Sequence, residues 1–191
     1  MTDRKVTMPT HRFNLAANPV QLRRSAVVRS RLLTISGISS ILDQMAGIPD
    51  LGVEGYLPEG IHTCTIDEVT TIFGEFQESD RRVRLAAALR RYHDELVASK
   101  IGKALLIDGS FVTAEARPND IDLVLVLPDD FDLKASVPPF EYNARSKKFV
   151  KKNYGFDLFP AFEHDLGPIV DLFSKVKERP DIRKGLLRVE L

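Results

Sequence analysis

The chain has 191 residues, 43% of them hydrophobic, and its 27 basic residues are balanced by 27 acidic ones. This length accommodates one domain with its own core plus an extension, and the neutral balance excludes a general attraction to nucleic acid or anionic lipid, so no strong DNA binding is expected. A single cysteine excludes an internal disulfide, and the lack of a long apolar run excludes a membrane span or secretory signal, which together predict a soluble, cytoplasmic protein.

Residues 1–50 are predicted to form an N-terminal extension that is partly helical or mobile. Apolar residues recur at helical spacing within residues 25–46. Residues 4–42 contain Arg and Lys but no Asp or Glu, a composition that also suits an organellar transit peptide. Glycines and prolines then crowd residues 47–60 and indicate a connecting loop. The main domain is therefore predicted to span residues 51–191.

Two helices are predicted in the first half of this domain. Thr65 followed by Glu68 is a capping-box pattern, in which each side chain satisfies the other residue's backbone N–H, and it indicates a helix ending near Phe73. A second helix is predicted over residues 79–99, because leucines and a tyrosine recur there at spacings of three and four. Its arginines are expected to form a solvated face; they are Arg81, Arg82, Arg84, Arg90 and Arg91.

Short apolar runs predict four strands, at residues 104–107, 121–127, 156–162 and 185–191. Pro160 cannot donate a ladder hydrogen bond, so its strand is expected at a sheet edge or to end early. A basic helix is predicted over residues 140–152, and a further helix over residues 168–178. The expected fold class is α+β, with a small mixed β-sheet and helices packed on it.

Two acids stand within the most apolar of these strands. Asp120 and Asp122 are two residues apart, so on a strand their side chains share one face, about 6.6 Å apart along the backbone. Burying an unpartnered carboxylate costs several kcal/mol, and a cation removes that cost. Mg²⁺ prefers oxygen ligands, and phosphoryl transfer often uses two ions about 3.5 to 4 Å apart. The pair therefore predicts a site for two Mg²⁺ ions, or Mn²⁺; the alternative is two solvated acids at a strand end.

Gly109 and Ser110 are predicted to form the other half of this site. Nine residues separate Ser110 from Asp120. Glycine lets a backbone approach a phosphate closely, and a serine at a helix entrance can donate its hydroxyl and backbone N–H to a triphosphate. Asp108, directly before this pair, is expected to form the turn or to support the ligands rather than to bind metal.

An apolar residue, Gly-Ser, a gap of nine and Asp-apolar-Asp-apolar together resemble the signature of the nucleotidyltransferase superfamily. This superfamily includes DNA polymerase beta, antibiotic nucleotidyltransferases and the minimal nucleotidyltransferases of bacterial toxin–antitoxin pairs. Residues 117–119, Arg-Pro-Asn, resemble the usual approach to the Asp pair, although Asn119 stands where many members have serine. More loosely, residues 57–191 are similar to small bacterial proteins of this superfamily that share the Leu-Pro-x-Gly-Ile-His opening of residues 57–62. The resemblance implies a nucleotidyltransferase-like fold.

The resemblance also implies a third carboxylate on a neighbouring strand, which helps to position or activate the attacking hydroxyl. We assign it to Asp157, with Asp165 and Asp171 as alternatives. The predicted catalytic and metal-binding residues are Asp120, Asp122 and Asp157. The predicted nucleotide-binding residues are Gly109, Ser110, Arg117 and Lys148. Lys148 belongs to the basic helix, which is either a solvated face or a surface that attracts triphosphate or RNA.

These expectations combine into a magnesium-dependent nucleotidyltransferase that moves a nucleoside monophosphate from a nucleoside triphosphate, such as ATP, to a hydroxyl and releases pyrophosphate. The acceptor is left open between a protein, a tRNA and a small molecule, with a toxin–antitoxin or defence role implied by the resemblance. The alternative is a catalytically inactive module of the same fold that binds nucleotide or neutralises a partner protein. A nucleic-acid-binding regulator is a third class, against which the neutral charge argues.

Overall fold

The computed structural model describes residues 47–76, 80–177 and 179–191. The chain divides into two compact units, residues 1–37 and 38–191, and all of the described residues belong to the second. The helix predicted over residues 25–46 and most of the predicted extension lie outside the described residues.

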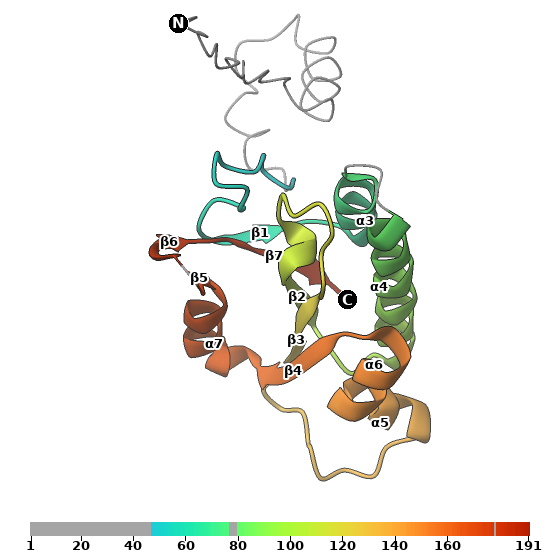
Figure 1. Ribbon diagram of the computed structural model, residues 1–191. Coiled ribbons are helices and arrows are strands. Elements are labelled where there is room, and N and C mark those ends of the chain that lie inside the picture. Colours follow the sequence, from blue (N-terminus) through green and yellow to red (C-terminus); the bar gives the residue numbers. More distant parts are fainter. Residues whose placement is uncertain (1–46, 77–79, 178) are drawn as a thin grey trace, which may run out of the picture. The chain divides into compact units, whose positions relative to one another are not determined.

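A five-stranded mixed sheet forms the centre of the second unit, with the order β1-β7-β2-β3-β4 (Figure 1). Its strands are β1 (Ile61–Thr63), β2 (Ala104–Asp108), β3 (Asp122–Leu127), β4 (Asp157–Phe162) and β7 (Leu186–Glu190). Strand β2 is antiparallel to both of its neighbours, whereas β1 pairs with β7, and β4 with β3, in parallel. The mixed sheet and its helices confirm the α+β class, and β4 lies at an edge, as Pro160 indicated.

Helices pack on both faces of the sheet, and Figure 1 shows α4 and α7 on opposite sides of it. The α-helices are α3 (Ile66–Gly74), α4 (Asp80–Ser99), α5 (Pro139–Arg145), α6 (Lys147–Tyr154) and α7 (Leu166–Phe173). Two 3-10 helices, η2 (Ser110–Val112) and η3 (Glu163–Asp165), and a hairpin of β5 (Lys175–Val176) and β6 (Arg179–Arg183) complete the described elements. None of the described helices is long and apolar enough to span a membrane.

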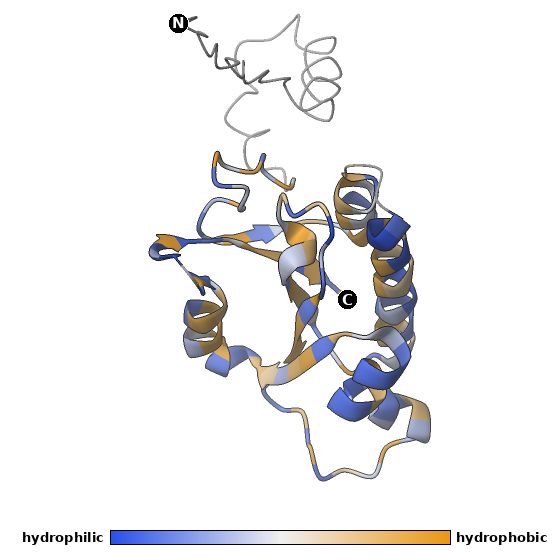
Figure 2. Ribbon diagram, in the orientation of Figure 1, coloured by the Kyte–Doolittle hydropathy of each residue, from blue (hydrophilic) through white to orange (hydrophobic). Residues whose placement is uncertain are grey.

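The central strands are largely hydrophobic (Figure 2), and alternation along them separates two apolar clusters. Ile107 and Leu123 belong to the larger cluster, which α3, α4 and α6 cover. Leu106 and Val124 point the other way, into a smaller cluster that packs against α7.

Local sequence signals explain several element boundaries. The Thr65 hydroxyl accepts from the Glu68 backbone N–H, and the Glu68 carboxylate accepts from the Thr65 backbone N–H at 2.8 Å, so the predicted capping box is confirmed. The predicted helix over residues 140–152 was wrong in one respect, because it is two helices separated at Ser146, whose hydroxyl accepts from the Phe149 backbone N–H and starts α6. The predicted helix over residues 168–178 ends at Phe173, because the chain enters β5 there.

Arg82 contradicts the expectation of a solvated arginine face. Its side chain is fully buried, at 0% exposure. It lies seven residues before Leu89 on α4, and residues at that spacing share a helix face, so it points inward with the apolar stripe. Two rings flank its guanidinium, which lies 4.9 Å from the Phe76 centroid and 5.6 Å from that of Phe111.

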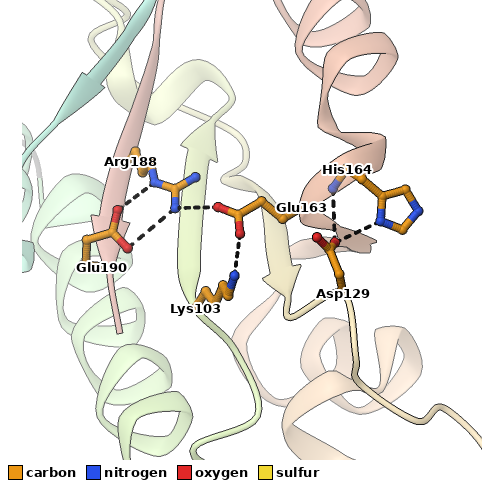
Figure 3. A network of polar contacts seen from close by, with 6 residues as sticks. All are labelled: Lys103, Asp129, Glu163, His164, Arg188 and Glu190. Carbon is orange, nitrogen blue, oxygen red and sulfur yellow. Dashed lines mark hydrogen bonds and ion pairs between the residues drawn. The ribbon is translucent and has the colours of Figure 1, made fainter.

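A network of polar contacts joins Lys103, which immediately precedes β2, to residues of β7 and η3 (Figure 3). Lys103 Nζ lies 2.5 Å from Glu163 Oε2, and Arg188 Nε lies 2.6 Å from Glu190 Oε1. Arg188 also reaches Glu163 at 3.5 Å, which joins the two pairs into one network. These side chains are partly exposed, so they fix the start of β2 more than they stabilise the fold.

Candidate active site

Three aspartates form a row across neighbouring strands at one end of the sheet. Asp108 ends β2, while Asp122 and Asp157 begin β3 and β4. The register places Asp108 opposite Asp122, and Asp122 opposite Asp157. Register partners point to the same face, and by alternation from Leu106 and Val124 this is the face that α7 covers. The sheet therefore gathers acids from three separate parts of the sequence.

The two outer acids of the row each have a lysine partner. Lys184 Nζ lies 2.7 and 2.8 Å from the two carboxylate oxygens of Asp108, which is 4% exposed. Lys151 Nζ lies 2.6 Å from Asp157 Oδ2. Within the described part of the chain, no hydrogen bond or ion pair reaches the carboxylate of Asp122. The central acid therefore lacks the compensation that its two neighbours have.

The pKa values follow from this arrangement. Burial raises the pKa of Asp122 to about 6, and the nearby charges of Asp120, Asp108 and Asp157 add to the effect. Burial also raises the pKa of Asp108, against the opposing charge of its lysine partner. Burial opposes ionisation of Asp120 too, but hydrogen bonds from Ser110 and two lysine charges outweigh it and lower that pKa. A cation bound beside Asp122 would relieve the repulsion at the centre of the cluster.

Ser110 ties the turn after β2 to Asp120. Its hydroxyl donates to Asp120 Oδ1 at 2.7 Å, and its backbone N–H donates to the same oxygen at 3.1 Å. The Ser110 hydroxyl oxygen in turn accepts from the backbone N–H of Asn119 at 2.8 Å. The nine-residue gap thus closes into a loop, and the two donors expected to face a triphosphate are directed at Asp120 in this structure. Ser110 consequently fixes the orientation of one predicted metal ligand.

Gly109 is required by the close approach of this turn to β3. Its φ of 91° lies in the region that disfavours side chains. A Cβ atom there would lie 2.9 Å from the backbone nitrogen of Asp122 and 3.1 Å from the carbonyl oxygen of Asp120. Any side chain at residue 109 would push the two halves of the site apart.

Two arginines at the start of α4 hold the loop between Ser110 and Asp120. The Arg82 guanidinium donates to the carbonyl oxygens of Phe111 and Thr113, each at 2.8 Å, and also to those of Phe73 and Glu115. Arg81 donates to the carbonyl oxygens of Pro118 and Asn119. Burial lowers the pKa of Arg82 to about 10, which leaves it charged at neutral pH. Both arginines therefore position the loop that carries the site.

A cleft of about 360 Å³ opens beside the row of acids. Its lining comes from the turn after β2, the start of β3, the β5–β6 hairpin and the segment before β1. The lining residues are Tyr56, Gly109, Ser110, Thr113, Glu115, Asp120, Asp122, Lys175, Val176, Lys177 and Lys184. The cleft is therefore acidic on the side of the strand ends and basic on the side of the hairpin.

The structure brings together four of the predicted site residues in this cleft, namely Gly109, Ser110, Asp120 and Asp122. Asp157 is their neighbour through its register with Asp122, although it does not line the cleft. The two alternatives for the third carboxylate lie elsewhere: Asp165 pairs with His164 at 3.4 Å, and Asp171 pairs with Lys175 at 2.7 Å. Of the three, Asp157 alone belongs to the row.

The other two predicted nucleotide-binding residues are not part of the cleft lining. Arg117 is exposed, and its backbone N–H donates to Glu115 Oε1 at 3.4 Å. Lys148 lines a separate depression of about 340 Å³ beside Tyr142 and Arg145. A larger depression of about 470 Å³ adjoins it, but that one is lined by no acid. The cleft beside the aspartates is therefore the better candidate for cation-dependent chemistry.

Sequence reasoning missed the lysines of the site. Lys184, which pairs with Asp108, and the cleft-lining Lys175 and Lys177 stand in a segment expected to be helical or unstructured. Lys151 belongs to the basic helix that was expected to be either a solvated face or a surface attracting triphosphate or RNA, whereas its position in the last turn of α6, six residues before Asp157, lets it reach that carboxylate. A signal was present only for Asp108, because an acid at the end of a fully apolar run needs a partner.

The donor set at the cleft fits a hydrated divalent cation. Asp120 and Asp122 supply carboxylate oxygens, and Mg²⁺ commonly takes one or two carboxylates and keeps water and phosphate oxygens in its remaining positions. Within the described residues, no three His, Cys, Asp or Glu side chains are arranged around one common point for a metal. Asp157 would have to leave Lys151 to join such a set. Asp120 and Asp122 are therefore the two carboxylates available to a cation at the cleft, and Asp157 could join them only after its ion pair with Lys151 is broken.

A family model described as "Family of unknown function (DUF6932)" matches residues 49–190, and the chain belongs to that family. Among curated proteins and solved structures, none matches this chain.

Proposed function

We propose that this protein is a magnesium-dependent nucleotidyltransferase, which moves a nucleoside monophosphate from a nucleoside triphosphate to a hydroxyl acceptor. A nucleotidyltransferase-like fold is part of the proposal. It is supported by the resemblance of the Gly109-Ser110 and Asp120-x-Asp122 motif and by the mixed sheet that brings its two halves together.

The observation that carries the proposal is the uncompensated carboxylate of Asp122. It lies between Asp108 and Asp157 in the row and beside Asp120, at the edge of an open cleft. Four acids close together repel one another, so their clustering beside one cleft points to a ligand with positive charge. The Gly109-Ser110 turn supports the proposal because it lines the same cleft and holds the Asp120 carboxylate in place.

The proposed reaction is a displacement at the α-phosphorus of the nucleotide. The acceptor oxygen forms a bond to this phosphorus, and the bond from the phosphorus to the oxygen that bridges to the β-phosphate breaks, releasing pyrophosphate. Bound Mg²⁺ would supply charge neutralisation at the phosphate oxygens. Asp120 and Asp122 would hold the cation, and Ser110 keeps Asp120 oriented. The acceptor hydroxyl would give its proton to a carboxylate of the row, a role that we assign to Asp157 on the edge strand β4.

The test uses purified protein, triphosphates labelled at the α-phosphate, Mg²⁺ or Mn²⁺, and cell extract as the source of acceptor. Label should pass to a macromolecule or small molecule with the wild type and be lost with Asp120→Asn and with Asp122→Asn. Asp94→Asn is the matched control, because Asp94 is an exposed acid of α4 far along the chain from the cleft. Transfer that persists in both cleft variants would contradict the proposal.

A second candidate is nucleotide binding without transfer, and one observation favours it. Lys151 Nζ lies 2.6 Å from Asp157 Oδ2, so the third carboxylate already has a cationic partner within the protein. A module of this kind would bind Mg²⁺ with nucleotide, requiring Asp122, and would transfer no label. Calorimetric binding of ATP with Mg²⁺, measured beside the labelling assay, separates the two candidates.

A further inference from the structure

The lining of the cleft also includes three lysines from the β5–β6 hairpin and its end. Lys175 and Lys177 flank Val176, and Lys184 follows β6 directly. Asp120 and Asp122 face the same cavity from the strand ends. A space of about 360 Å³ lined by both carboxylates and ammonium groups suits a ligand that carries both a bound cation and several negative charges.

These lysines differ in whether their ammonium groups already pair with an acid. Lys184 is committed to buried Asp108, and Lys175 pairs with exposed Asp171 at 2.7 Å. None of the described residues forms a hydrogen bond or ion pair with Lys177. Among the residues that the structure describes, Lys177 is thus a cation of the cleft lining without an acidic partner, and Asp122 is an acid of the same lining without a hydrogen-bonded or ion-paired cation.

The hairpin is held in place by contacts that do not involve the cleft. Arg183 reaches Glu59 Oε1 at 3.1 Å and Asp171 Oδ1 at 2.7 Å, and Arg179 reaches Glu54 Oε2 at 3.3 Å. The backbone N–H of Lys184 donates to the Ser174 carbonyl oxygen at 2.8 Å. Lys175 and Lys177 therefore project from a segment that other residues hold in place, and replacing these two lysines should leave the hairpin formed.

We propose that Lys175 and Lys177 of the β5–β6 hairpin bind the β- and γ-phosphates of a nucleoside triphosphate. The proposal rests on the proposed function for the identity of the ligand, and it adds a binding subsite in a part of the chain that the motif does not include. Lysine ammonium groups bind phosphate as point charges. The α-phosphate would then lie nearest Asp122, where the reaction needs it, and the released pyrophosphate would remain with the lysines.

The experiment measures binding of inorganic tripolyphosphate and of ATP by calorimetry, each with and without Mg²⁺. Compared with the wild type, Lys177→Gln should weaken both ligands about tenfold, and Lys175→Gln with Lys177→Gln should weaken them further, since each removes a charge-assisted hydrogen bond. Lys134→Gln with Lys152→Gln removes the same charge from exposed positions away from the cleft and should bind normally. Lys177→Arg should retain most of the affinity.

The outcome can be separated from that of the proposed function, because tripolyphosphate has no nucleoside to transfer. If labelling fails but tripolyphosphate binding depends on Lys177, the phosphate subsite stands and the transfer activity does not. If labelling succeeds and the hairpin variants bind both ligands like the wild type, the subsite is wrong and the activity stands. Equal weakening in the control pair, loss with Lys148→Gln instead, or tighter binding of a single-stranded oligonucleotide than of tripolyphosphate would also overturn it.

Discussion

Asp108 and Asp122 are register partners at the adjoining ends of β2 and β3, yet their surroundings differ in one essential way. Asp108 forms an ion pair with Lys184, whereas no cation among the described residues forms a hydrogen bond or ion pair with Asp122, and the charge of Lys184 lowers the pKa of Asp122 less than burial and the neighbouring acids raise it. Two like charges on neighbouring strands repel each other, so the pair costs stability unless a cation joins it. This cost can be measured.

Asp122→Asn is expected to stabilise the metal-free protein at neutral pH. The pKa of Asp122 is raised to about 6 in the fold, above its ordinary value of 3.8, so folding disfavours its ionised form. The cost is absent below the unfolded pKa, develops between roughly pH 4 and 6, and is complete above that range. Discounted for solvent screening, the gain at pH 7 should be about 1 to 2 kcal/mol. Urea unfolding from pH 5 to 7.5 measures it.

Magnesium should reverse the order of stability in the same experiment. A cation that binds the folded wild type alone stabilises it by mass action, and Asp122→Asn should lose this increment. Asp94→Asn serves as control and should follow the wild type in both buffers. A wild-type unfolding midpoint that does not change when millimolar Mg²⁺ is added, with or without ATP, would count against the cation site.

Gly109→Ala should destabilise the fold more than Gly155→Ala does. Both glycines have positive φ, but Gly155, with ψ 5°, lies in the left-handed helical region, where alanine costs about 1 kcal/mol, whereas Gly109, with ψ −178°, lies in a region essentially restricted to glycine. A Cβ at residue 109 would also meet Asp122 N at 2.9 Å, whereas one at residue 155 meets nothing within 4 Å. Thermal unfolding should show an additional loss of roughly 1 to 3 kcal/mol for Gly109→Ala. Equal losses would mean that the turn can move away from β3.

Arg82→Met should be among the most destabilising single changes in the domain. It leaves the carbonyl oxygens of Phe73, Phe111 and Thr113 without their buried donor, at a cost of about 3 kcal/mol or more. Arg84→Met, in the same helix turn but exposed, is the matched control and should change little. Chemical unfolding gives both values, and similar midpoints for the two variants would exclude a clamping role for Arg82.

Ser110→Ala should lower the affinity for Mg²⁺ with ATP and reduce the stability of the fold only moderately. The hydroxyl and backbone N–H of Ser110 help to lower the pKa of Asp120, and loss of the hydroxyl removes its hydrogen bonds to Asp120 and Asn119. A stability loss of about 1 to 2 kcal/mol is expected. Calorimetric titration with Mg²⁺ and ATP should show a larger relative effect, while Ser136→Ala in the exposed loop should show none.

The local signals predicted the central elements well because they depend on neighbours in the chain. The capping box at Thr65 and the apolar runs at β2, β3 and β4 place these elements within one or two residues. The short strand β1 and the β5–β6 hairpin were not predicted, since strands of two or three residues carry little periodicity. The inward direction of Arg82 could have been read from its spacing to Leu89.

The sequence by itself determined that Gly109, Ser110, Asp120 and Asp122 belong to one site, because spacing and strand alternation are local properties of the chain. Only the tertiary structure decided which charges meet there. Strand order and register place Asp108 and Asp157 on either side of Asp122, and the return of the chain after α7 brings Lys184 to Asp108. Charges interact over a few ångströms in space, whatever their separation along the chain, so these pairings follow from the topology of the sheet.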